Sequence, residues 1–151
     1  NASNPLLARV ENMGYVNFGP YFGKDFKGIL DGIAVNWQYQ DKYTSYPLPL
    51  DDISRLSFRE GAEISDNEPC VYRGSWTINE LPADSFLKFP GVRGVVWING
   101  FNIGRYWNIG PGSALYVPAP ILKRGRNEIV VLELCKLNKP SIDFADTPCL
   151  S

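Results

Sequence analysis

Few residues in this 151-residue chain belong to the types that carry out enzyme chemistry. The chain contains no histidine, which excludes Ser-His-Asp triads, imidazole general bases and zinc sites with nitrogen ligands. The aspartates, including the pair Asp51 and Asp52, follow no calcium-loop spacing. We therefore expect no metal site and no cofactor.

The three cysteines, Cys70, Cys135 and Cys149, show no C-x-x-C spacing, so the sequence predicts neither a metal knuckle nor a redox motif. Two interpretations remain open. The thiols can be free, or a disulfide between Cys135 and Cys149 can fix the C-terminal tail in an oxidising compartment.

Aromatic side chains are the remaining candidates for a binding site. Arg105, Tyr106 and Trp107 follow one another after a glycine. An exposed Trp beside a Tyr gives a flat face for sugar C–H groups and polar edges for hydroxyls, so Tyr106 and Trp107 are candidate substrate-binding residues. The other interpretation is structural: Trp97 and Trp107 fill a sandwich or dock on another domain, with Arg105 pairing to a carboxylate.

These residues must be positioned by strands. Fourteen Gly and twelve Pro are spread along the chain and separate short segments rich in Val, Ile, Tyr, Phe and Trp, which is typical of an all-β protein. No segment shows sustained helical periodicity. The expected strands are 6–10, 28–37, 71–78, 85–89, 94–98, 101–107, 114–117 and 127–134.

Two local features organise these strands. Asn99 and Gly100 predict a type I′ hairpin turn, because both central residues of that turn need positive φ. Residues 118–123 can form one helical turn that Gly125 ends. Segment 94–98 is apolar throughout, as expected for a strand buried on both faces by two packed sheets.

Pro47 and Pro49 mark the best internal boundary, since two prolines one residue apart break a sheet ladder. We expect residues 1–50 to form one part and residues 51–151 a β-sandwich domain. If the sheet in the first part is incomplete, its open edge invites pairing with a second copy, so a homodimer is a candidate assembly.

The composition indicates which classes of partner the chain can bind. The chain is 44% hydrophobic and has a net charge of −1, so it lacks the excess positive charge that binding to nucleic acid or an anionic membrane requires. No apolar run approaches the ~20 residues of a membrane span. The one basic cluster, residues 123–126, is expected to be a solvated hairpin tip.

Several motifs occur in an order that resembles the C-terminal β-sandwich of family-35 glycoside hydrolases, the β-galactosidases. The longest is residues 94–107, GVVWINGFNIGRYW. Others occupy residues 110–111, 115–118, 122–125 and 127–131, and upstream motifs occupy 10–14, 16–19 and 25–29. Together they cover most of residues 6–134.

The resemblance implies an all-β fold, a jelly-roll β-sandwich of the galactose-binding type over 51–151, with residues 1–50 closing a preceding β-domain. It also implies that the catalytic barrel, with its two glutamates, lies outside this chain. Asn-Glu pairs occur at 67–68, 79–80 and 127–128, but none has the context of a barrel strand. We expect no catalytic residue here.

The resemblance further implies that the chain packs on and supports that barrel in a protein that removes terminal β-linked galactose. Trp97, Asn99, Gly100 and Arg105 are then barrel-docking or structural residues. Phe18 stands where relatives often have a Tyr that reaches the sugar pocket, so it is a candidate substrate-binding residue or a core aromatic.

Two further functions stay open: a carbohydrate-binding module that holds galactosides through exposed aromatics, and a stand-alone structural or adhesive sandwich. A fold link to galactose binding is only an analogy, because sandwiches of this kind host many functions. The resemblance favours an extracytoplasmic location, whether periplasmic, secreted or lysosomal.

Overall fold

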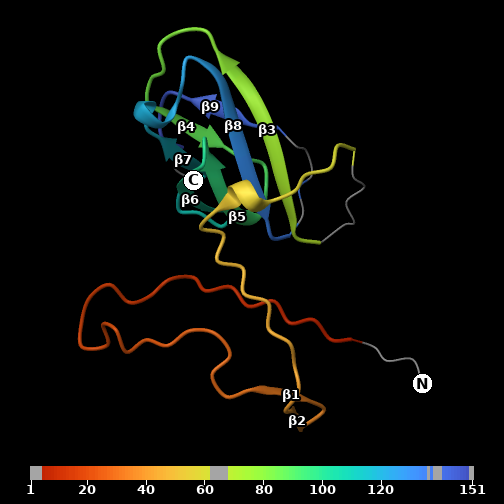
Figure 1. Ribbon diagram of the computed structural model, residues 1–151. Coiled ribbons are helices and arrows are strands. Elements are labelled where there is room, and N and C mark those ends of the chain that lie inside the picture. Colours follow the sequence, from red (N-terminus) through yellow and green to blue (C-terminus); the bar gives the residue numbers. More distant parts are fainter. Residues whose placement is uncertain (1–4, 62–67, 136, 138–140, 150–151) are drawn as a thin grey trace. The chain divides into compact units, whose positions relative to one another are not determined.

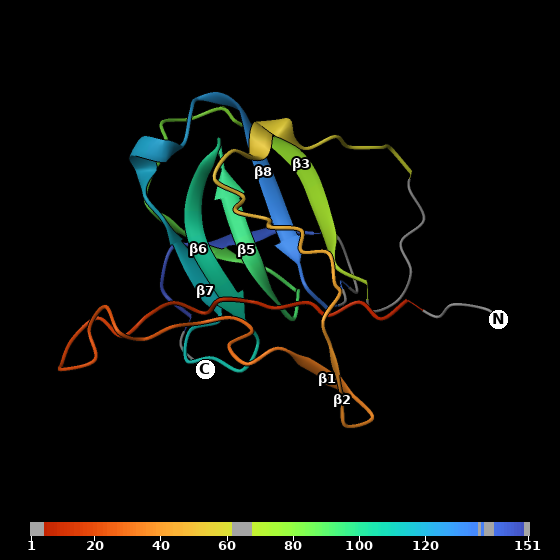
Figure 2. The same ribbon diagram turned by 60° about the horizontal axis from the view of Figure 1, so that its bottom comes forward.

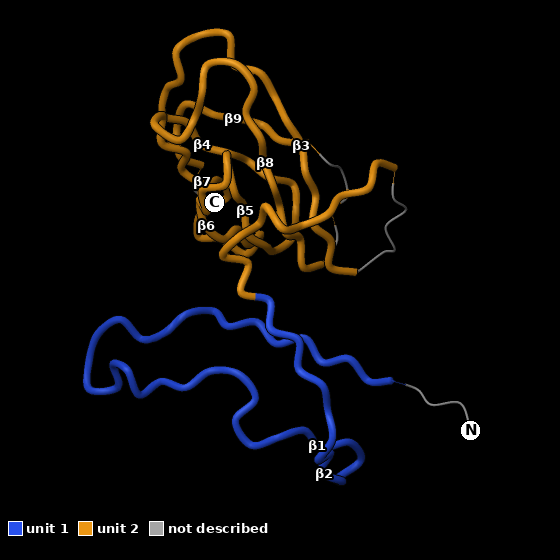
Figure 3. The backbone as a smooth tube through the Cα atoms, viewed as in Figure 1, with its two compact units in different colours: residues 1–48 blue, residues 49–151 orange. Residues whose placement is uncertain are grey.

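A computed structural model (Figure 1) describes residues 5–61, 68–135, 137 and 141–149. The chain divides into two compact units, Asn1–Leu48 and Pro49–Ser151 (Figure 3). Among the residues that the structure describes, only those of the second unit form a sizeable buried core.

The first unit has little regular structure. Its only strands among the described residues are β1 (Ile33–Val35) and β2 (Gln38–Gln40), an antiparallel pair. The expected strand at 6–10 is wrong, and the one at 28–37 shrinks to β1. Apolar residues suited to a strand lack a partner strand there, and Leu7 is 89% exposed.

The second unit is a β-sandwich, as the alternation of short apolar segments predicted. Its strands are β3 (Cys70–Ile78), β4 (Ser85–Lys88), β5 (Arg93–Ile98), β6 (Phe101–Trp107), β7 (Ala114–Val117), β8 (Gly125–Glu133) and β9 (Asp143–Ala145). The six predicted strands of this region are confirmed to within two residues at each end, whereas β9 was not anticipated. Short 3-10 helices, η1 (Ile53–Arg55) and η2 (Ala119–Ile121), complete the unit.

Two antiparallel sheets form the layers. One has the strand order β3-β8-β5-β6, visible side by side in Figure 2, and the other has the order β7-β4-β9. Leu87 and Val117 of the smaller sheet pack with Val96, Ile98 and Ile129 of the larger one. The core therefore lies between the sheets, where inward side chains alternate with outward ones along each strand.

The hairpin between β5 and β6 turns at Asn99 and Gly100, with φ of 50° and 83°. Both values are positive, as the predicted type I′ turn requires. Strand β6 also contains a bulge, because Val96 pairs with Gly104 while Trp97 pairs with Asn102. Gly104 has φ of 125°, a conformation that side chains disfavour, and the bulge uses this freedom.

The helical turn predicted at 118–123 is present as η2. Its first residue, Ala119, is hydrogen-bonded to Asp84, which lies outside the turn. The Asp84 carboxylate accepts hydrogen bonds from the Ala119 amide and the Tyr116 hydroxyl, both at 2.8 Å. These two bonds, the Ala119 one first, lower the pKa of Asp84 below its ordinary value. The connection from β7 to β8 is thereby tied to the segment before β4.

Candidate functional site

Tyr106 is buried, which agrees with the structural interpretation of this residue. Its ring packs edge-to-face on Phe89 with 4.9 Å between centroids, and its hydroxyl donates a 2.9 Å hydrogen bond to Glu133. Only 9% of the residue is accessible. Tyr106 therefore offers no open ring face to a ligand, which disfavours the interpretation of Tyr106 and Trp107 as a sugar platform.

The bulge in β6 explains this burial. In the register of an uninterrupted two-residue hairpin, Arg105 would stand opposite Gly94. Gly94 lies on the same face of β5 as Val96 and Ile98, which face the core. The extra residue at the bulge instead pairs Tyr106 with Gly94. Tyr106 thus turns inward, while Arg105 and its neighbour Trp107 turn to the outer face of the sheet.

Trp107 is half-buried on that outer face and is flanked by two arginines. The guanidinium carbon of Arg93 lies 5.2 Å from the ring centroid, and that of Arg105 lies 5.3 Å from it. Arg93 is also the cross-strand partner of Trp107. The three side chains form a cation–π cluster, a composition common at protein interfaces.

Glu133 is the residue that sequence analysis missed. It is 1% exposed, and its carboxylate accepts hydrogen bonds from the amides of Val92, Arg93 and Cys135 and from the Tyr106 hydroxyl. Burial and this hydrogen bond raise the pKa of Tyr106 far above its ordinary value. Glu133 lies on the same face of β8 as Ile129 and Val131, which belong to the core. Its partners come from distant segments, and the other face of β8 carries Val130 and Leu132, so no alternation in the sequence marked it as buried.

A second buried polar network lies at the hairpin end of the sheet. Asn127 is fully buried, and its side-chain amide donates to the carbonyls of Lys123 and Gly125 at 2.7 and 3.0 Å. The Asn99 side-chain amide donates to Asn127 Oδ1 and to the Ile121 carbonyl. Asn99 and its turn partner Gly100 therefore have a structural role here.

Trp97 is buried on the face of β5 opposite to Val96 and Ile98, and its cross-strand partner is Val130. Both faces of this end of β5 are thus buried, as its apolar composition predicted. Nearby, residues 53–58 run beside the outer face and bound an open groove of about 430 Å³.

Phe18 lies in the first unit and is 87% exposed. Close to it in sequence, the Val16 amide donates to the Asp25 carboxylate at 3.1 Å, and Lys27 forms a 3.0 Å ion pair with the same group. The Lys27 hydrogen bond, followed by that of Val16, lowers the pKa of Asp25. These contacts join the motifs 16–19 and 25–29.

The described part of the chain shows no group of three metal-ligating side chains. All three cysteines are free thiols, so the bridge between Cys135 and Cys149 is absent. No helix in the described residues is both long and apolar enough to cross a lipid bilayer.

Comparison with protein families gives two matches. Residues 69–127 match the model of the β-galactosidase galactose-binding domain, and residues 1–49 match that of the β-galactosidase first all-beta domain. The two ranges agree with the motifs that carried the resemblance.

Curated relatives extend the similarity over nearly the whole chain. β-Galactosidase 17 of Arabidopsis thaliana is 36% identical over 95% of the chain. β-Galactosidase 1 of Dictyostelium discoideum is 37% identical over 95%, and human β-galactosidase is 37% identical over 93%. The aligned region is 24%, 22% and 25% of these relatives, so the chain spans about a quarter of their length.

Proposed function

As the chain belongs to the β-galactosidase family, in which it matches the non-catalytic all-beta and galactose-binding domains, we propose that it works within an enzyme that removes terminal β-linked galactose. The catalytic barrel then lies elsewhere in the same polypeptide. The observation that carries the proposal is the similarity of nearly the whole chain to a quarter of several β-galactosidases.

The chemistry belongs to that barrel. Retaining hydrolysis uses two carboxyl groups about 5 Å apart, one as nucleophile and one as general acid and base. Three glutamates of the sandwich lack the setting of a barrel carboxylate: Glu133 accepts four hydrogen bonds in the core, and Glu128 and Glu80 lie on and beside strands of the sandwich. This region therefore contributes packing and support, without a catalytic group.

Each unit has its own part in this proposal. Residues 1–50 form the C-terminal part of a preceding β-domain, and their exposed apolar side chains are covered by the strands of that domain. Phe18 reaches the sugar pocket of the barrel, where a phenyl ring packs on the apolar face of galactose. The cluster of Arg93, Arg105 and Trp107 docks on the rest of the enzyme.

We expect the complete enzyme to hydrolyse p-nitrophenyl β-galactoside and to leave the α-anomer intact. We also expect the 151-residue chain alone to give no turnover above buffer, because it lacks the carboxylate pair. Release of nitrophenol in parallel assays checks both statements. Hydrolysis by the isolated chain, or a preference of the complete enzyme for the α-anomer, would contradict the proposal.

A carbohydrate-binding module remains the second candidate function. The structure weakens it, because Tyr106 is buried and the ring of Trp107 carries two guanidinium groups in place of an open face. Neutral galactose should therefore leave the Trp107 indole resonance of the labelled chain unmoved.

A further inference from the structure

The groove at the hairpin end of the larger sheet is built entirely from the second unit. Residues 53–58 supply one wall through the half-buried side chains of Ile53, Leu56 and Phe58. Val130 of β8 and Gly100 of the β5–β6 turn also line the groove. Its volume of about 430 Å³ lies in the range of small-molecule sites.

Positive charge converges on this groove from distant parts of the sequence. Arg73 comes from β3, while Lys123 and Arg126 flank the start of β8. All three are exposed, and within the described residues none of them forms an ion pair. Arg73 lies over the Phe58 ring at 4.4 Å, which holds its guanidinium at the wall.

The neutral polar groups that line the groove are already engaged. Both N–H groups of the Asn99 amide and both of the Asn127 amide donate within the protein, as described above. The hydroxyl of Ser54 donates to Asp52 at 2.6 Å. The donors left for a ligand are the three cations, and Glu128 is the acidic acceptor among the lining residues.

We propose that this groove binds an acidic saccharide. A carboxylate or sulfate of the ligand pairs with Arg73, Lys123 and Arg126, a hydroxyl donates to Glu128, and the ring lies along the apolar wall. The saccharide class rests on the proposed function, whereas the preference for a negative charge rests on the groove alone. A neutral sugar would leave the net positive charge of the groove, three cations against Glu128, uncompensated.

The test is an NMR titration of the isotope-labelled 151-residue chain, followed at the amides of Gly100 and Val130. Galactose 6-sulfate and galacturonic acid are the test ligands, and galactose and inorganic sulfate are the matched probes. We expect the two acidic sugars to give saturable chemical-shift changes with millimolar dissociation constants, and we expect added salt to weaken this binding. Galactose and sulfate should bind markedly more weakly, since galactose lacks the negative charge and inorganic sulfate lacks the sugar ring.

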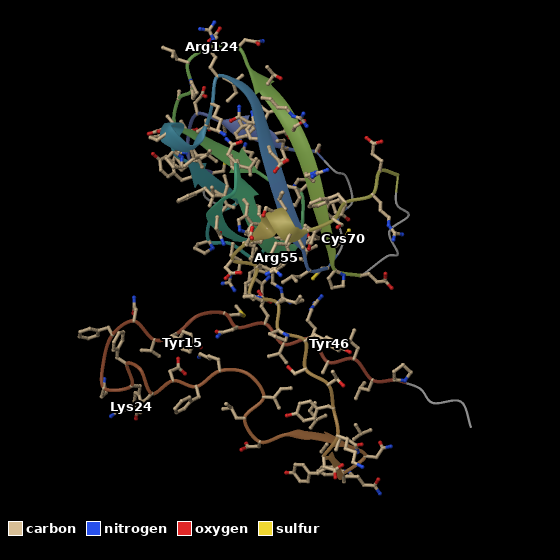
Figure 4. All side chains as sticks on the ribbon, in the orientation of Figure 1. Tyr15, Lys24, Tyr46, Arg55, Cys70 and Arg124 are labelled. Atoms are coloured by element: carbon tan, nitrogen blue, oxygen red, sulfur yellow. The ribbon has the colours of Figure 1, made fainter. Side chains whose placement is uncertain are left out.

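Variants locate the site. Arg73→Gln and Arg126→Gln should each weaken binding of galactose 6-sulfate by about tenfold, because each removes a charged hydrogen bond. Arg124→Gln is the matched control: Arg124 lies at the tip of the same basic segment (Figure 4) but does not line the groove, and affinity should stay within about twofold. Thermal melting of each variant checks that its fold is intact.

Each other outcome overturns the proposal. If inorganic sulfate bound as tightly as galactose 6-sulfate, the groove would be an anion site that does not recognise the sugar. If galactose bound as tightly as galactose 6-sulfate, the negative charge would have no role in recognition. Absence of shifts in a dispersed spectrum, or equal effects of Arg124→Gln and Arg126→Gln, would remove the site. The hydrolysis assay is independent of this titration, so either proposal can fail alone.

Discussion

Replacing Glu133 by alanine is expected to lower the free energy of unfolding of the second unit by about 3–5 kcal/mol. The carboxylate is 1% exposed and accepts four hydrogen bonds, three from backbone amides and one from Tyr106. In the alanine variant those buried donors lose their acceptor, and a cavity replaces the side chain. This network joins β5, β6 and β8, so its loss should loosen the larger sheet as a whole.

Urea unfolding of the 151-residue chain, followed by Trp fluorescence, measures this loss. Glu80→Ala is the matched control, because Glu80 is exposed beyond the end of β3 and its removal should change stability by less than about 0.5 kcal/mol. If Glu133→Ala and Glu80→Ala unfolded at the same urea concentration, the carboxylate would not hold the sheet.

Gly94→Ala should destabilise the same unit by about 3 kcal/mol or more. A Cβ atom on Gly94 would collide with the backbone carbonyl of Leu132 and with the Tyr106 hydroxyl. A carbonyl in a central strand cannot move aside as a flexible side chain can, so β5 and β8 must separate. Glycine is required here by the close approach of atoms from the neighbouring strands.

Gly112→Ala serves as the comparison, since the nearest atom to an added Cβ there is the Ala114 carbonyl oxygen at an ordinary 3.9 Å. Thermal unfolding of both variants and the parent chain separates the two cases. We expect a large drop in Tm for Gly94→Ala and a small change for Gly112→Ala. Equal Tm values for the two variants would show that the close approach at Gly94 is relieved without strain.

Much of the sandwich follows from sequence because local signals and packing agree there. Asn99 and Gly100 specify their turn through backbone conformation alone, and the apolar composition of segment 94–98 indicates a strand buried on both faces. The motif order also identified the family. In these segments the conformational preference of each residue agrees with its burial in the sandwich, so the strands and the turn could be predicted without knowledge of tertiary contacts.

The remaining features depend on partners that sequence spacing does not reveal. The bulge before Gly104 shifts the register by one residue, which buries Tyr106 and turns Trp107 outward. The groove combines residues from four separate segments, so the sequence showed only part of its positive charge, the basic run at 123–126. Strand 6–10 was expected from apolar composition, but a strand also needs a neighbour with which to pair.

In the proposed function, the β-sandwich unit supports a β-galactosidase by its packing and does not touch the reacting sugar. The most direct measurement compares kcat/KM and the thermal-inactivation half-life of the complete enzyme with those of its Tyr106→Phe variant. Loss of the hydroxyl removes one hydrogen bond to Glu133, worth about 1 kcal/mol. We predict an unchanged kcat/KM, within about twofold, and a shorter half-life. A raised KM with an unchanged half-life would contradict the claim, because Tyr106 would then act on the substrate.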